Sequence, residues 1–212
     1  MRDWPLDGLR LSCRDVTLRP VREADLPALA DVLPADFEQD PRLELFPGLS
    51  DEQNQRRLFY QGYWKSLGTW SPSSWVLHFA VAYRGSLVGV QTLEGESFPQ
   101  LRTVDSASWL VPEVRGRGLG VAMRMAVLGL SFDHLGAVAA VSSAVVGNAA
   151  SLGVSRHIGY VENGVGLVAV PGGSVAELRN LRLTAAAWRA AGHGGTVTVE
   201  GVVPCLPWFG LA

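Results

Sequence analysis

The amino-acid sequence predicts an α+β fold: one mixed, mostly antiparallel sheet of about seven strands, flanked by about four to five helices. Two observations predict it. Segments with apolar residues at helical spacing alternate with runs rich in β-branched residues along the whole chain. The chain has 212 residues, which suits one domain with a sizeable core. We therefore expect a single domain at 1–195 and a C-terminal extension, 196–212, that packs on the domain or on a partner subunit.

The first part of the chain predicts a strand and two helices. Val16–Pro20 is rich in β-branched residues, which is typical of a strand. From Arg22 to Leu33 the apolar residues recur at helical spacing, and a second amphipathic helix with an aromatic face is expected from Asp51 to Leu67. Something must cover that aromatic face.

A β-meander is expected next. The β-rich runs Val76–Tyr83 and Ser86–Leu93 are separated by Arg84-Gly85, and a short connection that contains glycine indicates a hairpin. A third run, Thr103–Val111, is expected to complete the meander as one continuous strand.

The second half predicts helices and strands in alternation. Apolar residues at helical spacing from Val121 to Phe132 predict a helix of about four turns that ends near Gly136. Ala137–Val146 is almost wholly apolar, which is typical of a strand buried on both faces. The remaining elements are expected to be a helix at 148–158, strands at 164–170 and 175–183, and a helix at 184–191. The tail, 196–212, contains Pro204 and Pro207 and is not expected to be helical.

The overall composition narrows the classes of function. The formal net charge is −2 and only 18% of the residues are charged, so no broad positive field attracts nucleic acid. No window reaches the roughly 18 uninterrupted apolar residues of a membrane span, and the first residues carry mixed charge where a secretory signal is apolar. The two cysteines and four histidines are scattered. We expect a cytoplasmic protein with no metal and with neither nucleic acid nor a membrane as partner.

A glycine-rich turn, Arg115-Gly116-Arg117-Gly118-Leu119-Gly120, lies between the third β-run and the helix after it. Glycines leave room beside the backbone, and the free amides at a helix start attract anions, so a diphosphate fits there. A P-loop would end in Gly-Lys-Ser/Thr, where this chain has Leu119-Gly120-Val121. A dinucleotide fingerprint would need Gly or Ala at position 121 and an acid about 20 residues further on. The nearest acid, Asp133, falls inside the helix pattern.

The turn resembles that of the GNAT superfamily of N-acetyltransferases, which is written Arg/Gln-x-x-Gly-x-Gly/Ala, at Arg115, Gly118 and Gly120. Ser108–Glu113 is similar to the fourth strand of the RimJ/RimL-like subgroup, which acetylates ribosomal-protein N-termini. The other similar segments are Leu18-Arg19-Pro20, the Asn-x-x-Ser element at 148–151 and the Gly-Tyr element at 159–160. The resemblance spans 16–185.

The resemblance implies an enzyme that uses acetyl-CoA or another acyl-CoA as co-substrate, without a metal. It also implies that the fourth and fifth strands splay apart and that the pantetheine arm lies between them. A backbone N–H of Leu110 or Val111 would then meet the oxyanion of the tetrahedral intermediate. The residues expected to contact coenzyme A are Trp109, Leu110, Val111, Arg115, Gly116, Arg117, Gly118, Leu119, Gly120, Val121 and Asn148.

A base is needed because an amine must be neutral to attack a thioester, and amines are protonated at neutral pH. Asp105 stands four residues before Trp109, so the strand period puts both on one face, at a level where similar enzymes often carry a carboxylate. The alternative is that Asp105 faces solvent. Glu94 and Glu96 are further candidates that would act through a water molecule.

An acid must protonate the leaving thiolate. In the resembling subgroup the serine of Asn-x-x-Ser lies near the CoA sulfur, which implies Ser151. The alternative is that Asn148 is a plain helix N-cap and Ser151 an ordinary polar helix residue. Tyr160 is the other hydroxyl, with a core position as its alternative.

The acceptor is expected to be an amine, either a protein N-terminus or a small molecule. Aromatic residues are candidates for the acceptor mouth or for the core: Phe59, Tyr60, Tyr63, Trp64, Trp70 and Trp75. A hypothesis from another class is a non-catalytic acyl-CoA-binding sensor or scaffold. The tail with Trp208 and Phe209 suggests a homodimer as a further expectation.

Overall fold

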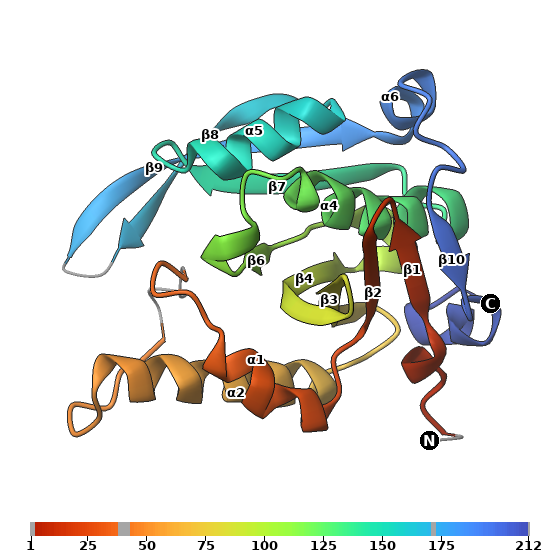
Figure 1. Ribbon diagram of the computed structural model, residues 1–212. Coiled ribbons are helices and arrows are strands. Elements are labelled where there is room, and N and C mark those ends of the chain that lie inside the picture. Colours follow the sequence, from red (N-terminus) through yellow and green to blue (C-terminus); the bar gives the residue numbers. More distant parts are fainter. Residues whose placement is uncertain (1–2, 38–42, 171–172, 212) are drawn as a thin grey trace.

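The computed structural model describes residues 3–37, 43–170 and 173–211 (Figure 1). Within these residues ten strands form two sheets, with helices on both sides. The first sheet has the strand order β10-β1-β2-β3-β4-β6 and the second the order β5-β7-β9-β8. All neighbouring strands are antiparallel except β5 and β7. The predicted α+β class is confirmed, with the sheet opened into two.

The first sheet contains the predicted hairpin. Arg84 and Gly85 connect β3 to β4 with φ of 51° and 84°, both left-handed, the geometry that suits the twist of two paired strands. β1 and β10 were not expected, since four and three residues are too few to give a strand signal. The strands of this sheet are β1 (Arg10–Cys13), β2 (Val16–Pro20), β3 (Ser74–Tyr83), β4 (Ser86–Glu96), β6 (Ser108–Leu110) and β10 (Thr198–Glu200).

Two helices cover one face of this sheet, α1 (Leu26–Asp31) and α2 (Asp51–Gly68), and form the lower layer in Figure 1. The helix expected from Arg22 to Leu33 is shorter and begins with a tight turn, η2 (Glu23–Asp25). A capping box fixes the start of α2. Ser50 Oγ accepts a hydrogen bond from the Gln53 N–H at 3.2 Å, and Gln53 Oε1 accepts one from the Ser50 N–H at 2.9 Å. In the described part of the chain, no helix has the length and apolar character to cross a membrane.

The expectation that Thr103–Val111 is one strand is wrong, because the run is divided between the two sheets. β5 (Thr103–Val104) runs parallel to β7, whereas β6 pairs with β4. Asp105, between them, already pairs with Glu94 in the register that β6 keeps. The residues on the two sides of this crossing have similar strand propensity, so only the change of partner divides the run.

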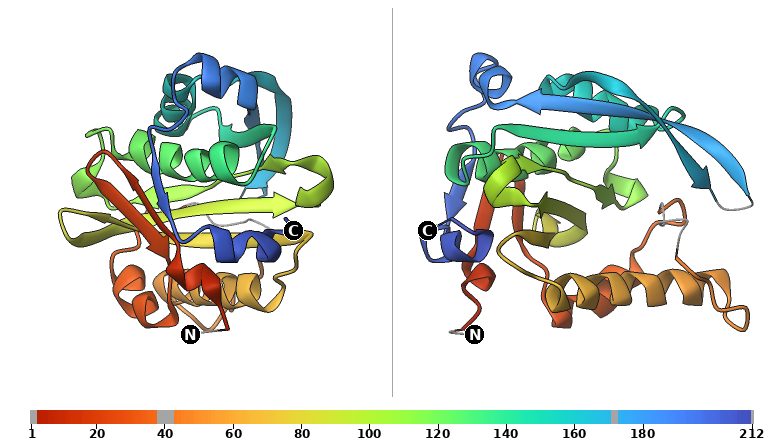
Figure 2. Two further views of the ribbon diagram at one scale, coloured as in Figure 1. Left: turned by 90° about the vertical axis from the view of Figure 1, so that its right-hand side faces the viewer. Right: turned by 180° about the vertical axis from the view of Figure 1, so that it is seen from behind.

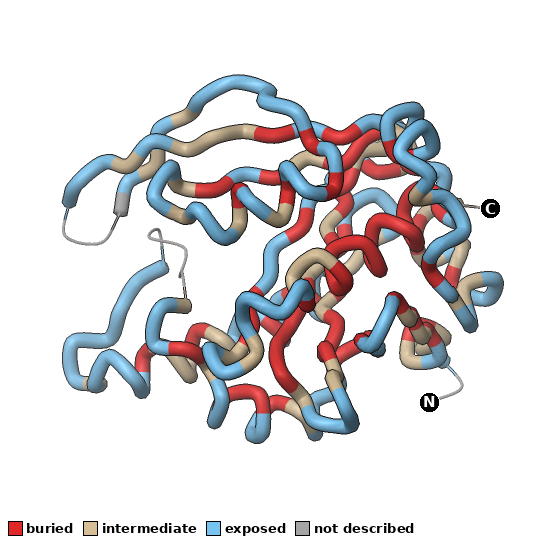
Figure 3. The backbone as a smooth tube through the Cα atoms, turned by 45° about the horizontal axis from the view of Figure 1, so that its top comes forward, coloured by how far each residue is buried: buried red, intermediate tan, exposed pale blue. Residues whose placement is uncertain are grey.

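The opposite face carries α4 (Leu119–Gly129), continued by a π-helical turn, η4 (Leu130–His134), with α5 (Ala149–Ile158) beside it. α4 is buried along most of its length and packs against the strands of the first sheet. Figure 3 shows that buried residues concentrate in the middle of the molecule, whereas the outer helical turns are exposed. The core therefore lies between α4 and the sheets.

The second sheet consists of β5, β7 (Ala139–Val145), β8 (Val161–Val170) and β9 (Ser174–Thr184). The expectation that its apolar strand, β7, is buried on both faces is wrong in part, since Ser143 is exposed. The β8–β9 hairpin projects beyond the body of the molecule (Figure 2). The sequence Pro171-Gly172-Gly173 predicts a turn between these two strands, and residues 171–172 of it lie outside the described part. Short elements complete the chain: η1 (Pro5–Gly8), α3 (Phe98–Leu101), η3 (Pro112–Val114) and α6 (Ala185–Ala190).

The C-terminal tail is more regular than the sequence suggests. The expectation of a non-helical tail is wrong, because η5 (Val203–Phe209) is a 3₁₀ helix, a form that two prolines with fixed φ tolerate over one or two turns. β10 pairs with β1, and Cys205 and Phe209 are fully buried. Both termini lie on the same side of the molecule (Figure 2). The described tail residues therefore share the hydrophobic core with the N-terminal strands.

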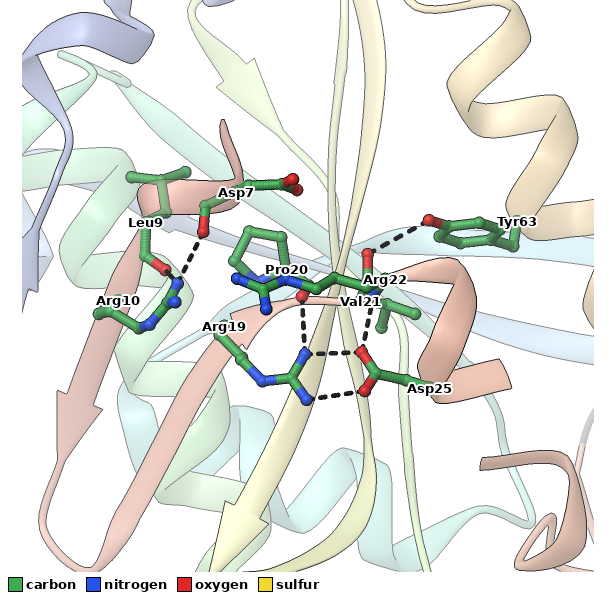
Figure 4. A network of polar contacts seen from close by, with 9 residues as sticks. All are labelled: Asp7, Leu9, Arg10, Arg19, Pro20, Val21, Arg22, Asp25 and Tyr63. Atoms are coloured by element: carbon green, nitrogen blue, oxygen red, sulfur yellow. Dashed lines mark hydrogen bonds and ion pairs between the residues drawn. The ribbon is translucent and has the colours of Figure 1, made fainter. Parts of the chain in front are cut away.

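An ion pair fixes the chain where β2 turns into the helical layer (Figure 4). Arg19 Nη1 and Nη2 donate to the two carboxylate oxygens of Asp25 at 2.6 and 2.8 Å. The Arg22 N–H donates to the same carboxylate at 2.8 Å. These hydrogen bonds, first that of Arg19, hold the pKa of Asp25 below its usual value against the opposing effect of burial.

We expect Asp25→Asn to lower the free energy of unfolding by about 2 kcal/mol, since a bidentate charged pair is lost. That corresponds to a fall in Tm of about 4–8 °C. Because the folded-state pKa is depressed, the stabilisation is present above the unfolded pKa of about 3.9 and is lost as the pH falls through the lower folded value. Thermal unfolding of both proteins at neutral pH and near pH 3 measures this.

Asp31→Asn is the matched control, because its ion pair with Arg56 at 2.8 Å is exposed. Exposed pairs contribute about 0–1 kcal/mol. Equal losses in the Asp25 and Asp31 variants would contradict a special role for the Arg19–Asp25 pair.

Candidate active site

A cavity of about 880 Å³ opens between the two sheets. β4 and β6 line one wall and β7 the other, and the cavity reaches the glycine-rich turn, α5 and the α1–α2 layer. Val111, Arg117 and Leu119 are not among its lining residues. The expected site residues that do line it are Asp105, Trp109, Leu110, Arg115, Gly116, Gly118, Gly120, Val121, Asn148 and Ser151.

The glycine-rich turn presents open backbone at one end of this cavity. Gly116 and Gly118 have φ of 74° and 79°, a left-handed conformation in which other residues are strained. A Cβ at either position would meet no atom within 4 Å, so the space before the turn is open. Gly118 is the N-cap of α4, whose first N–H groups have no partner within the helix. Amides and the positive end of the helix dipole together favour an anion here.

Arg115 is held by a partner that sequence reasoning missed. Its Nη1 and Nη2 donate to the two carboxylate oxygens of Asp36 at 2.6 and 2.8 Å, and its Nε donates to the Leu110 carbonyl at 2.9 Å. The hydrogen bond from Arg115 lowers the pKa of Asp36. No local pattern marks Asp36, which stands 79 positions before Arg115. The pair ties the segment after α1 to the glycine-rich turn.

The backbone of β6 offers one side to β4 and the other to the cavity. The Val111 N–H donates to the Val88 carbonyl at 2.9 Å, so it faces β4. Backbone groups alternate along a strand, so the N–H of Leu110 points away from β4, toward β7. Of the two amides expected at the oxyanion, only that of Leu110 has the required direction, and its role stays a prediction.

Two carboxylates lie opposite each other at the crossing between the sheets. Asp105 and Glu94 exchange two backbone hydrogen bonds of 2.9 Å, so their side chains are on the same face, and both line the cavity. Glu96 is exposed and lies outside the lining. Among the described residues no further Asp, Glu, His or Cys joins a group that could hold a metal ion.

The protein environment raises the pKa of both carboxyl groups. Asp105 is exposed, as its alternative interpretation holds, although it lines the cavity. The protein around its carboxyl group still displaces water and raises the pKa of Asp105, against the opposing effects of the Ser106 N–H, at 2.6 Å from Oδ1, and of the charge of Arg124. For Glu94 burial raises the pKa and the negative charge of Asp105 raises it further. Both groups therefore bind a proton more tightly than a carboxyl group in water, as proton acceptors in catalysis need.

The Asn-x-x-Ser element begins α5 at the cavity wall. Asn148 Oδ1 accepts from the Ser151 N–H at 3.0 Å, so Asn148 caps the helix. Ser151 is half-buried and lines the cavity. Tyr160 is buried outside the lining, and burial raises its pKa. The position of Ser151 suits contact with a ligand better than that of Tyr160.

The expected aromatic set divides between the cavity and the core. Phe59 and Tyr63 line the cavity, and Phe37 and Phe59 pack edge-on against Trp109 with centroids at 6.2 and 6.4 Å. Trp70 and Trp75 instead stack on each other at 6.0 Å in the core. Tyr60 and Trp64 contact each other at 5.6 Å. The mouth on the α1–α2 side is therefore apolar and aromatic.

His78 was not expected at this site. It lines the cavity and lies 2.8 Å from Ser66 Oγ through its Nε2. Burial lowers its pKa to about 4. The ring is therefore neutral at neutral pH.

Comparisons with known proteins agree with this geometry. Residues 15–161 match the family model described as acetyltransferase (GNAT) domain. RimJ of Mycobacterium smegmatis, solved in complex with CoA-disulfide, has a TM-score of 0.63 at 19% identity, over 89% of this chain and 97% of that chain. The ribosomal-protein-S5-alanine acetyltransferase from Vibrio fischeri has a TM-score of 0.63 at 12% identity, over 84% and 98%. Mutant forms of the spermidine/spermine N-acetyltransferase SpeG from Vibrio cholerae have a TM-score of 0.62 at 15% identity, over 84% of this chain and 98% of that chain.

Proposed function

Because the chain belongs to the GNAT acetyltransferase family, we propose that it moves an acetyl or related acyl group from coenzyme A to a primary amine, by direct attack in a ternary complex. The observation that carries this proposal is the single cavity that joins the glycine-rich turn to the carboxylates of Asp105 and Glu94. One end suits a diphosphate and the other an amine that must lose a proton.

The residues present fit coenzyme A. The left-handed glycines at 116 and 118 leave open space before the start of α4, which supports the expected diphosphate site. The N–H of Leu110 on the cavity side of β6 supports the expected contact with the pantetheine arm, since it offers the hydrogen bond that a neighbouring strand would take. Coenzyme A supplies the activated thioester.

The proposed reaction is one nucleophilic substitution at the acyl carbon. The amine nitrogen attacks the thioester carbonyl, a C–N bond forms and the C–S bond breaks. The ammonium proton passes to Asp105, with Glu94 as the alternative base, and the thiolate takes a proton from Ser151. Asp105 then releases its proton to water and Ser151 regains one from water, so that both groups return to their starting state. The N–H of Leu110 stabilises the oxyanion.

The acceptor is proposed to enter on the α1–α2 side, over Phe37, Phe59 and Trp109. Asp105 and Glu94 share the sheet face of Trp109, so an amine at this mouth meets them first. Both a protein N-terminus and a small amine suit an apolar mouth that ends in carboxylates. The ribosomal-protein-S5-alanine acetyltransferase and SpeG share the fold, and their names refer to a protein and to small amines as acceptors.

The test of this proposal is a titration with acetyl-CoA followed by an amine panel. Saturation at about 100 times Kd should stabilise the protein by about 2.7 kcal/mol, or about 5–10 °C in Tm. A thiol-detecting reagent then follows CoA release with peptides that differ in their first residue and with polyamines. A Tm shift without turnover on any amine would favour the sensor or scaffold, and no Tm shift would remove the proposal.

Ser151→Ala is expected to lower kcat about tenfold, with the Kd of CoA within about twofold of wild type. The substitution removes the hydroxyl, whereas the backbone bond from residue 151 to Asn148 does not depend on it. Steady-state rates and calorimetric titration measure the two quantities. Ser151→Thr keeps a hydroxyl and should retain most of the rate, and an unchanged kcat in Ser151→Ala would return Ser151 to a structural role.

Cytoplasmic location and a homodimer stay predictions. The extension at 196–212 is proposed to pack on its own domain, in view of the buried Cys205 and Phe209. Light scattering on the full chain measures the oligomeric state directly.

A further inference from the structure

Arg124 is a buried cation that makes no ion pair with the described residues, although its charge acts on the carboxyl group of Asp105. It is only 3% exposed, although it lines the cavity. A guanidinium has five N–H donors, and among the described residues Arg124 makes one side-chain hydrogen bond, from Nη1 to Ser142 Oγ at 3.2 Å. Its Nε has no partner there, and no carboxylate lies within ion-pair distance. Burying a charge with so few hydrogen bonds and no ion pair costs folding free energy, so we infer that Arg124 is kept at this position by a functional role.

Two hydroxyls lie beside Arg124: that of Ser106, which lines the cavity, and that of Tyr160, which contacts both Arg124 and Ser106. Both residues are at least nine-tenths buried, and the charge of Arg124 acts on Tyr160. Residues 106, 124 and 160 come from three separate parts of the chain, so the fold has gathered hydroxyl groups and a positive charge at one place. Such a group is complementary to a carboxylate.

The location of this group favours the acyl-CoA over the acceptor as the source of such a carboxylate. Asp105 points to the α1–α2 face of the first sheet, like Trp109. Ser106 is the next residue, so by strand alternation it points to the opposite face, where α4 carries Arg124. Arg124 is also on the helix whose start forms the proposed diphosphate site, six residues after Gly118, or about 9 Å along its axis. The cation therefore lies on the sheet face of the proposed acyl-CoA site, opposite the acceptor mouth but within electrostatic reach of Asp105.

We propose that Arg124 and Ser106, with the Tyr160 hydroxyl packed behind them, form a subsite for a carboxylate at the far end of the acyl chain, so that the enzyme prefers a dicarboxylic acyl-CoA to one with an uncharged acyl chain. This inference rests on the proposed acyl transfer. The bonds made and broken are the same, and the distal carboxylate passes unchanged into the amide product. Ser142 positions Arg124 through its hydrogen bond.

The first experiment measures binding to the wild-type protein. Calorimetric titrations use succinyl-CoA, butyryl-CoA, which has the same number of carbons and no carboxylate, and acetyl-CoA. The subsite predicts that succinyl-CoA binds at least about tenfold more tightly than butyryl-CoA, because a charge-assisted hydrogen bond to a buried guanidinium is made only by the former. Equal affinities for these two ligands would overturn the inference and leave the proposed function standing. Failure of all three to bind would remove both.

The second experiment tests the residues. Arg124→Gln removes the charge and should abolish the preference for succinyl-CoA while the Kd of acetyl-CoA stays within about threefold. Arg124→Lys keeps a charge and should retain part of the preference. Ser106→Ala is the milder variant that keeps the test decisive if Arg124→Gln does not fold, and it should weaken succinyl-CoA binding alone. A preference that survives in Arg124→Gln or in Ser106→Ala would contradict the assignment.

Two other roles for Arg124 predict different results. If Arg124 stabilised the leaving thiolate, Arg124→Gln would lower kcat equally for acetyl-CoA and succinyl-CoA. If it bound a carboxylate of the acceptor, the wild-type enzyme would favour phenylalanine over phenethylamine, and Arg124→Gln would remove that preference. Either outcome would overturn the acyl subsite.

Discussion

Replacement of Gly118 by aspartate is expected to lower the affinity for coenzyme A about 100-fold, or about 2.7 kcal/mol. Gly118 is left-handed, begins α4 and has no atom within 4 Å of a built Cβ. The new carboxylate would therefore stand in the open space that we assign to the diphosphate. Repulsion between charges about 5 Å apart at an effective dielectric constant of about 20 is about 3 kcal/mol, which gives this magnitude. Calorimetric titration with CoA measures it.

Gly118→Asn is the matched control, because asparagine has nearly the shape of aspartate and tolerates the left-handed conformation. We expect it to weaken CoA binding by no more than about tenfold, through bulk alone. Equal affinity in the Asp and Asn variants would show that no negative charge is bound there. Wild-type affinity in both would remove the turn from the binding site.

Asp105→Asn is expected to lower kcat by about 10²–10³, with little change in the Kd of acetyl-CoA. Only the deprotonated carboxylate accepts the amine proton, so the wild-type rate should rise with pH as Asp105 ionises. The surrounding protein raises the pKa of Asp105, so this rise of the rate should be centred at a pH above about 3.9, the usual pKa of an aspartate. The Asp105→Asn variant should lack this rise of the rate with pH. Rates at saturating acetyl-CoA across the acidic pH range measure both effects.

Two neighbouring substitutions make this test specific. Glu96 is exposed and lies outside the cavity lining, so the Glu96→Gln variant should keep wild-type turnover. Glu94→Gln removes the second carboxylate and should reduce kcat less than Asp105→Asn does. A large loss in Glu94→Gln with normal turnover in Asp105→Asn would transfer the role of base to Glu94.

Local signals made much of the fold predictable. Ser50 and Gln53 mark the start of α2, and Arg84-Gly85 marks the β3–β4 turn, because each acts through bonds or dihedrals within a few residues. Asn148 marks α5 in the same way. The glycine-rich turn could be found because the anion site that we propose there needs a backbone without side chains, and glycines are visible in the sequence. The cavity does gather most of the residues expected from that turn and from the Asn-x-x-Ser element.

The features that sequence could not predict depend on partners far away in the chain. The division of Thr103–Val111 depends on β7 competing with β4 for the same run. Asp36 gains its role only when the fold brings Arg115 to it. Arg124 follows the pattern of an ordinary helix residue, yet the packing of α4 encloses it. In each case the amino acid is visible in the sequence and its environment is not.

The crossing at Asp105 also has a mechanical consequence. Since β6 belongs to one sheet and β7 to the other, the two sheets are joined along one side, by the β5–β7 pairing and by α4, and are separate along the other. Thermal motion should then widen and narrow the cavity between the sheets, with the residues around Asp105 as the hinge. If coenzyme A binds between the two sheets as proposed, it should hold them at a fixed separation, and we expect the sheets to loosen when the free thiol leaves.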